Sequence, residues 1–273
     1  KNRINILNKE NFNNYKKNKL NILSFKTKNI NTNTMDSLNI SYELTQKKKF
    51  IGILTLPINK YKIKKNIDKS FIDQTSFFSK KEKERYSNMV FYHKKKIFIP
   101  LTIHIEIKKV YKSFQNKILM SKKIENLYYT LVNDFKITKP KMILAGINPH
   151  AGENQTISKD DNKYLLPIIN LLKKRGLFID GPVSGDGMIN NQNLNYYDAF
   201  IFTYHDQALI PFKILSNYQG VNFTSNLDII RVSPSHGTAE NLIGSKKVIS
   251  NGIINCFNLI KKINRNRNKI DSS

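Results

Sequence analysis

The sequence predicts an α/β fold with mostly parallel strands, because short apolar runs alternate with longer amphipathic runs from about residue 50 onward. Parallel strands covered by helices on both faces are nearly continuous in apolar residues, and four segments fit that description. They are residues 50–58 (FIGILTLPI), 97–105 (IFIPLTIHI), 142–146 (MILAG) and 198–206 (DAFIFTYHD). One earlier strand is expected at 20–25, within a polar and otherwise uninformative opening.

Amphipathic helical patterns lie between the expected strands, at residues 106–119, 121–135 and 158–176. The last of these begins at Ser158, with Asp161 three residues on, and ends with basic residues before Gly176. That arrangement suits helix capping and the helix dipole at both ends. Pro167 lies inside the pattern, so we expect it to kink the helix.

The chain is strongly basic: 46 Lys and Arg against 20 Asp and Glu give a formal charge of +26 over 273 residues. The lysines are spread along the chain with abundant Asn and Ile, as an AT-rich genome would produce, and no nucleic-acid recognition motif accompanies them. We therefore expect no nucleic-acid partner, although the positive field would attract phosphorylated metabolites. A basic nucleic-acid-binding protein is the alternative, and salt-sensitive retention on DNA would test it.

No run approaches the roughly 20 apolar residues of a membrane helix, and the start has no signal-peptide core, so we expect a cytoplasmic protein without a membrane partner. The chain lacks an initiator Met, so it is expected to begin inside a longer protein. Its single cysteine, Cys256, cannot form an internal disulfide. It lies in an apolar helical pattern and is expected to be a buried, inert thiol.

Three of the five histidines, His104, His150 and His205, lie at or just after the end of an apolar run. The carboxyl ends of parallel strands share one edge of a sheet, where ligands bind, so these imidazoles could converge. Three neutral imidazoles with an open position form a common site for a divalent transition metal. Asp206 and Glu153 lie nearby and could orient such imidazoles. The alternative for each histidine is a carbonyl cap or a loop contact, and for each carboxylate a loop hydrogen bond.

Cations follow downstream, where Lys213, Asn222 and Arg231 suit a phosphorylated, carboxylate-bearing substrate beside a metal. Lys213 alone would equally fit a solvated surface position. Arg231 is more notable, because this lysine-rich chain places an arginine inside an apolar run. The stretch SHGTAENLIG, residues 235–244, resembles a tight loop leading into a helix, where backbone N–H groups can receive phosphate.

Several uncommon motifs occur in order, and they resemble the 4-hydroxythreonine-4-phosphate dehydrogenase family of pyridoxal phosphate biosynthesis. The motifs are GINPHAGE, DGPVSGD, YDAFIFTYHDQALIPFK and GVNFTSNLDIIRVSPSHGTAENLIG. The resemblance implies a two-domain α/β/α architecture of the isocitrate/isopropylmalate dehydrogenase type, with the active site in the interdomain cleft of a homodimer and shared between its subunits. It implies a cofactor-side domain of residues 1–75 plus 196–273 and a second domain of residues 76–195.

The family's functional residues carry over onto matching positions of this chain. The implied metal ligands are His104, His150 and His205. The implied substrate contacts are Gln74, Thr75, Lys213, Asn222 and Arg231, with Asp186 and Lys213 as catalytic candidates. The cofactor contacts implied are His236, Gly237 and Thr238.

The chemistry implied is oxidation followed by decarboxylation of 4-phosphooxy-L-threonine to 3-amino-2-oxopropyl phosphate. The resemblance implies NAD as the oxidant, with NADP possible, and one divalent ion, Zn, Mg or Co. The ion would lower the pKa of the substrate hydroxyl and stabilise the enolate as carbon dioxide leaves.

The chain departs from the family pattern on one side of the expected cleft. The family motif T-G-H-T-E reads IDQTS here, so Thr75 is kept but the phosphate-contacting histidine is Gln74. Glutamine donates hydrogen bonds but carries no positive charge. The motif G-P-V-H-K-G reads LPINKY, and the family's opening P-G-E-P-A-G-I-G-P has no match. An inactive homologue that keeps the fold and the metal site is therefore the alternative to an active dehydrogenase.

Overall fold

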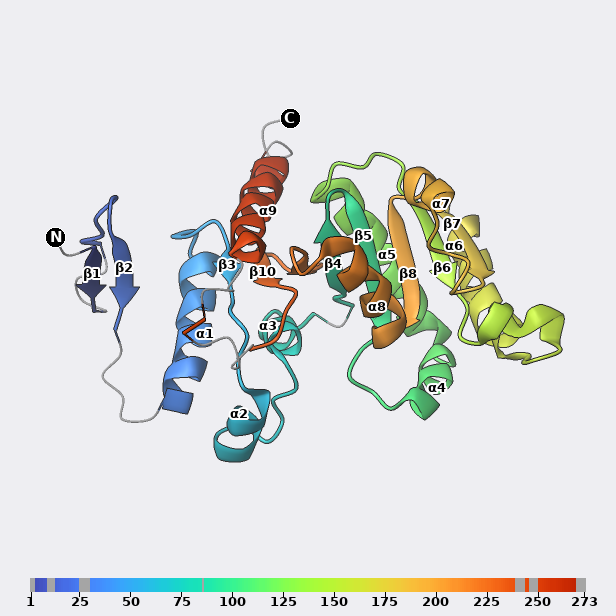
Figure 1. Cartoon of the computed structure of the whole chain (residues 1–273), viewed down its shortest axis with the longest axis horizontal. Coiled ribbons are helices and arrows are strands. Elements are labelled where there is room, and N and C mark those ends of the chain that lie inside the picture. Colours follow the sequence, from blue (N-terminus) through green and yellow to red (C-terminus); the bar gives the residue numbers. More distant parts are fainter. Residues whose placement is uncertain are drawn as a thin grey trace.

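The computed structural model describes residues 3–8, 13–24, 30–84, 86–238, 244–245 and 250–268. Figure 1 shows the arrangement of its elements. In chain order they are β1 (Ile4–Leu7), β2 (Leu20–Leu23), α1 (Ile30–Gln46), β3 (Ile53–Leu54), α2 (Lys60–Asn66), α3 (Gln74–Lys81), β4 (Met89–His93), β5 (Lys96–Thr102), η1 (Ile107–Lys109), α4 (Val110–Phe114), α5 (Lys117–Asn133), β6 (Lys141–Ala145), η2 (Pro149–Gln155), η3 (Asp161–Leu165), α6 (Leu166–Lys174), β7 (Phe178–Val183), α7 (Asn191–Tyr196), β8 (Ala199–Tyr204), α8 (His205–Ser216), β9 (Val221–Thr224), β10 (Arg231–Pro234) and α9 (Asn251–Asn268).

The central sheet has eight strands in the order β3-β10-β9-β4-β5-β8-β6-β7. Strands β5, β8, β6 and β7 run parallel to one another. Strand β4 is antiparallel to both β5 and β9, and β10 is antiparallel to β9 but parallel to β3. The carboxyl ends of β5, β6 and β8, which precede His104, His150 and His205, therefore share one edge of the sheet, as predicted. The division into residues 1–75 plus 196–273 and residues 76–195 stays a prediction.

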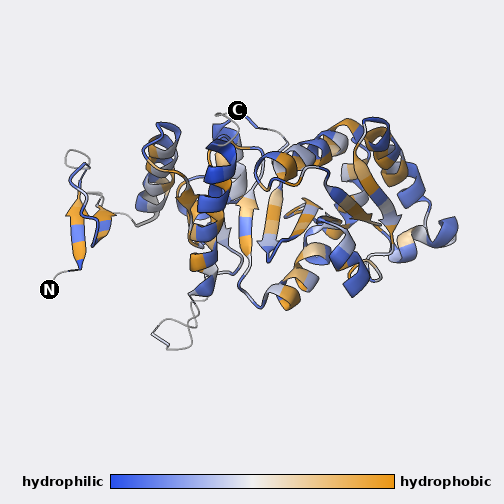
Figure 2. Cartoon of the chain, turned by 90° about the horizontal axis from the view of Figure 1, so that it is seen from above, coloured by the Kyte–Doolittle hydropathy of each residue, from blue (hydrophilic) through white to orange (hydrophobic). Residues whose placement is uncertain are grey.

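Helices cover both faces of this sheet. One buried cluster joins α5, α6 and α9 to one face, and a second joins α8 to the other, where the phenylalanine rings of β5 and β8 stack. Alternate side chains of these strands point to opposite faces and belong to the two clusters in turn, which explains why the strand sequences are apolar throughout. In Figure 2 the strands are accordingly mostly orange, while the helices carry blue outer faces. A third cluster packs α1, α2 and α3 around β3.

Three local predictions differ from the structure. The expected strand at 50–58 is reduced to the two residues of β3, because Leu56 is 54% exposed and Pro57 has no N–H for a ladder. The expected helix at 106–119 breaks before Asn116, whose side chain accepts the N–H of Leu119 at 3.0 Å and starts α5.

The helix predicted at 158–176 is also irregular, because a π-helical turn precedes α6 and Pro167 lies in the first turn of α6. Proline has no N–H to donate, and here it follows Leu166, whose N–H bonds to the carbonyl of Asp161 in the π-helical turn. Asp161 does not complete a capping box. It is fully buried and its carboxylate accepts the backbone N–H of Ile147 and the side chain of Asn148, which fixes the loop after β6.

Two features lie away from the main sheet. Strands β1 and β2 form a separate two-stranded parallel sheet beyond α1, at the far left of Figure 1. Cys256 is a buried free cysteine on α9, and burial raises the pKa of its thiol to about 12, which confirms the prediction of an inert thiol. Among the described residues, no helix combines the length and apolar character needed to cross a bilayer.

Candidate functional site

A cavity of about 380 Å³ draws residues from α3, β4, α8, β9 and β10 and from the segment after β5. This volume is typical of a small-molecule site. The structure brings most of the predicted site residues into its lining: Gln74, Thr75, His104, His205, Lys213, Asn222, Arg231, His236, Gly237 and Thr238. Two predicted residues, His150 and Asp186, lie elsewhere.

Two imidazoles face each other in this cavity. The ring centroids of His104 and His205 are 5.5 Å apart, because β5 and β8 are neighbours and end at the same edge. His104 Nδ1 lies 2.8 Å from Asp73 Oδ2, and His205 Nδ1 lies 2.7 Å from Asp206 Oδ1. A carboxylate accepts hydrogen bonds, so both Nδ1 atoms donate and both Nε2 atoms stay available as ligands. Two such nitrogen donors fit part of a divalent-metal site.

Asp73 is a candidate site residue that the sequence did not single out. Its Oδ1 accepts the backbone N–H of Ser76 at 2.8 Å and so caps α3, while its Oδ2 meets His104. Burial alone would raise the pKa of this carboxyl, but the hydrogen bonds from His104 and Ser76 outweigh burial and lower the pKa to about 2. Asp73 is therefore ionised at neutral pH although it is only 3% exposed.

His150 lies in a separate hollow of about 550 Å³ with Asp186 and Asp206. It belongs to a turn, residues 150–155, in which every residue has a positive φ, and its side chain is exposed. The pKa of Asp186 is lowered, first by a hydrogen bond from Ser184 and to a lesser extent by the charge of His150. Within the described part of this chain, no three metal-ligating side chains come together. The structure thus unites two of the three predicted histidines.

Arg231 is 2% exposed and donates all five of its N–H groups to neutral oxygens. The acceptors are Thr55, Gln74, Thr75 and Thr224, at 2.7–3.3 Å. Burial lowers the pKa of the guanidinium to about 10, so it remains charged. Its hydrogen-bond acceptors are all neutral, and the nearby charge of Asp73 partly offsets the effect of burial by raising the pKa.

Other groups that line the cavity are free to bind a ligand. Asn222 Oδ1 and Ser235 Oγ are buried and have no hydrogen-bond partner among the described residues. Such atoms normally have partners, so each is a candidate contact for a bound molecule. Lys60 also lines the cavity. Sequence reasoning missed Lys60 and Ser235, although Lys60 lies in the LPINKY motif and Ser235 precedes the predicted cofactor residue His236.

The predicted cofactor loop is only partly described. His236 Nδ1 lies 2.9 Å from the carbonyl of Gly237, and this segment borders the same cavity as the imidazole pair. Residues 239–243 of the motif lie outside the described residues. The cofactor role of His236, Gly237 and Thr238 therefore stays a prediction.

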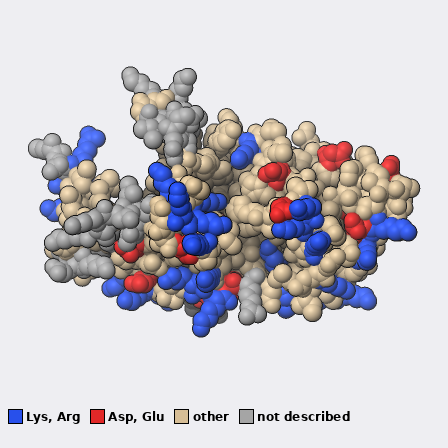
Figure 3. All heavy atoms as spheres, turned by 90° about the horizontal axis from the view of Figure 1, so that it is seen from below, with Lys and Arg blue, Asp and Glu red and all other residues tan. Residues whose placement is uncertain are grey.

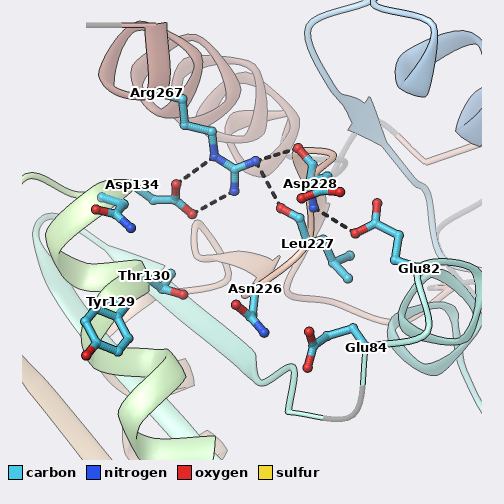
Figure 4. Close-up of a pocket in the computed structure, with 10 residues that line it drawn as sticks. Glu82, Glu84, Tyr129, Thr130, Asp134, Asn226, Leu227, Asp228 and Arg267 are labelled. Atoms are coloured by element: carbon cyan, nitrogen blue, oxygen red, sulfur yellow. Dashed lines mark hydrogen bonds and ion pairs between the residues drawn. The ribbon is translucent and has the colours of Figure 1, made fainter. Parts of the chain in front are cut away.

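A larger hollow of about 580 Å³ lies between α3, α5 and α9. Figure 4 shows that its charged groups point toward one another: Arg267 pairs with Asp134, and Glu82 accepts the backbone N–H of Asp228. Arg267 and Asp134 neutralise each other, and Glu82 accepts the backbone N–H groups of Asp228 and Ile229, so we interpret the hollow as a structural junction. Figure 3 shows that Lys and Arg are scattered over the face seen there rather than gathered in one stripe.

These features define an α/β protein whose cleft joins a pair of imidazoles with available Nε2 atoms to a buried, positively charged guanidinium and to the lysines Lys60 and Lys213. The family model described as the pyridoxal phosphate biosynthetic protein PdxA matches residues 2–260, and the chain belongs to this family. The resemblance found in its motifs is thereby confirmed.

Known relatives support this membership. A 4-hydroxythreonine-4-phosphate dehydrogenase of Aquifex aeolicus is 34% identical over 212 residues, covering 78% of this chain and 65% of the relative. A protein of the same name from Bacteroides thetaiotaomicron is 30% identical over 193 residues, covering 70% and 52%. The chain therefore spans roughly half to two thirds of the length of these relatives.

A crystal structure confirms the fold. That of 4-hydroxythreonine-4-phosphate dehydrogenase from Klebsiella pneumoniae superposes with a TM-score of 0.81, covering 96% of this chain and 83% of that chain at 22% identity. At this identity the likeness establishes the architecture alone, which is the α/β/α type that the resemblance implied.

Proposed function

We propose that this protein catalyses the NAD-dependent, divalent-metal-dependent oxidation and decarboxylation of 4-phosphooxy-L-threonine to 3-amino-2-oxopropyl phosphate. The observation that carries the proposal is one cavity that combines the pair His104 and His205 with the cations Lys60, Lys213 and Arg231. An amino-acid phosphate needs both kinds of group, one to hold its hydroxyl near a metal and one to hold its anions.

Lys60 and Lys213 would bind the anionic ends of the substrate, and the charge of Arg231, whose N–H groups are bonded within the chain, would attract them. Lys213 lies on α8, on the same helix as His205 and in the same cavity lining, and no hydrogen bond of its ammonium is recorded within the described chain. Asn222 Oδ1 could accept the substrate ammonium, since it is buried and unpartnered. Gln74 acts differently from the family histidine. Its Oε1 accepts from Arg231 at 2.7 Å and its Nε2 donates to the carbonyl of Leu56, so it holds the guanidinium in place.

A divalent ion would polarise the substrate hydroxyl, and NAD would accept a hydride from the carbon that bears this hydroxyl. The chain's part is to hold these groups in place. His104 and His205 present Nε2 atoms for the ion, because Asp73 and Asp206 occupy their Nδ1 atoms. Ser235 and the segment that follows it line the other end of the same cavity, where the cofactor is expected.

We further propose that a second copy of the chain completes the metal site with its His150. Within one chain His150 lies apart from the imidazole pair, and α8 beside it exposes Ile210 by 63% and Ile214 by 76%. Such an apolar face next to an incomplete site suits a homodimer contact. Mixing His104→Ala and His150→Ala subunits should restore one intact site in each mixed dimer, whereas each variant alone has none. Equal zinc content in mixed and separate preparations would refute the shared site.

The test of the proposed function is formation of NADH by the purified protein with 4-phosphooxy-L-threonine, NAD and a divalent ion. We expect NADH formation that EDTA removes, loss of it in His205→Ala, and no loss in His93→Asn. His93 serves as a histidine control because it ends β4 and does not line the cavity. No NADH from folded, metal-loaded protein would refute the proposal and favour the inactive homologue, for which the absent motif histidine at position 74 is the main argument.

A further inference from the structure

Asp73 connects two walls of the cavity through a single buried carboxylate. One oxygen accepts the backbone N–H of Ser76 at the start of α3, and the other lies 2.8 Å from His104 Nδ1 beyond the end of β5. The side chain of Asp73 is 4% exposed and that of His104 is 30% exposed. A buried hydrogen bond of this kind holds a ring more firmly than an exposed one, because water does not compete for the carboxylate.

The bond also decides which nitrogen of His104 carries the proton. The carboxylate oxygen of Asp73 is the acceptor at 2.8 Å, so Nδ1 is the donor, and in the neutral imidazole the lone pair then lies on Nε2. His104 has φ of +52°, an unusual backbone conformation for a residue with a side chain. Such a conformation persists where surrounding contacts hold it, and the Asp73 bond is a side-chain contact of this kind.

We infer that Asp73 is a positioning residue, which fixes the Nδ1–H tautomer and the ring orientation of His104 so that Nε2 can bind a divalent metal ion. The inference rests on the proposed function in that it takes His104 as a metal ligand. It is specific to this chain, because the motif T-G-H-T-E has glycine where IDQTS has Asp73, and glycine has no side chain to accept the bond.

Two substitutions separate positioning from helix capping, since serine and asparagine are both good caps. Asp73→Ser keeps a cap oxygen but is too short to reach His104. In Asp73→Asn the amide oxygen must still accept from Ser76, so the NH₂ group faces His104 and donates to Nδ1. The proton of His104 would then lie on Nε2, and Nε2 cannot bind a metal ion while it carries this proton. Asn116→Ala is the matched control, because it removes the cap of α5 at a place that does not line the cavity.

The experiment uses the metal-free protein labelled with ¹⁵N-histidine, in which five rings are to be assigned. We expect NMR to show Nδ1–H at His104 in the unsubstituted protein, Nε2–H in Asp73→Asn and a mixture in Asp73→Ser. Zinc affinity, measured by competition with a chromophoric chelator, should fall by about 10- to 100-fold in both variants and stay unchanged in Asn116→Ala.

An unchanged His104 tautomer and unchanged zinc affinity in Asp73→Asn would overturn the inference, whether or not Asp73→Ser folds. Both readouts are independent of substrate and NAD. Absence of NADH formation together with the expected tautomer changes would refute the proposed function and leave the role of Asp73 standing.

Discussion

Replacing Arg267 with alanine should destabilise the protein strongly, because this side chain joins three parts of the fold (Figure 4). Its Nε and Nη2 donate to the two oxygens of Asp134 at 2.7 and 2.9 Å, and Nη1 donates to the carbonyls of Leu227 and Asp228. The Asp134 side chain is 5% exposed, so the substitution leaves a buried carboxylate without its partner.

The magnitude follows from that burial. Breaking a buried ion pair from one side costs about 3–5 kcal/mol, and the 24% exposure of Arg267 places this pair at the lower end, about 3 kcal/mol. The control is Arg175→Ala, which removes a pair with Glu125 in which the arginine is 40% exposed. A surface pair of this kind contributes at most about 1 kcal/mol.

Urea unfolding of both variants measures the difference, with the slope of the transition checked for equality. We expect the midpoint to fall markedly for Arg267→Ala and little for Arg175→Ala. Equal midpoint shifts in the two variants would refute the reasoning, because burial would then not decide the strength of the pair.

Three further predictions concern the charged groups of the chain. Burial lowers the pKa of Lys123 to about 8. Between about pH 8 and the ordinary lysine pKa of about 10.5, the unfolded chain therefore binds more protons than the folded chain, and the free energy of unfolding should rise with pH. Relative to Lys123→Met the rise should reach roughly 2–3 kcal/mol, and parallel pH profiles of the two proteins would contradict it. Lys213→Met should raise KM for the phosphorylated substrate about 10- to 100-fold, with the exposed Lys112→Met as control; an unchanged KM would exclude Lys213 as an anion contact. His205→Ala should weaken zinc binding at least about 100-fold, and wild-type zinc content after dialysis would remove His205 from the ligands.

The parallel half of the sheet could be predicted from the sequence because its strands are apolar throughout and end in polar loops. That pattern placed His104 and His205 at neighbouring strand ends, and the structure brings their rings to 5.5 Å. Arg231 was identified because an arginine inside an apolar run is unusual in this lysine-rich chain, and Lys213 because it matches a motif. Both residues line the cavity.

Other site features depend on tertiary structure and leave no local pattern. Asp73 lies 31 residues before His104, and only the packing of α3 beneath the end of β5 brings them together. His150 obeys the strand-end rule, yet the left-handed turn at residues 150–155 carries it away from its expected partners. No periodicity in the sequence indicates such a turn, because only Gly152 and Asn154 in it are residues that favour positive φ.

The buried guanidinium of Arg231 has a consequence for how ionic strength should act on binding. Mobile counter-ions collect around the exposed lysines of a chain with formal charge +26 and screen their field, but they screen the field of a side chain that is 2% exposed much less. Salt should therefore slow the encounter with an anionic substrate, which the outer field steers, more than it hastens departure of the bound anion. In stopped-flow measurements, added potassium chloride should lower the association rate constant and leave the dissociation rate constant nearly constant.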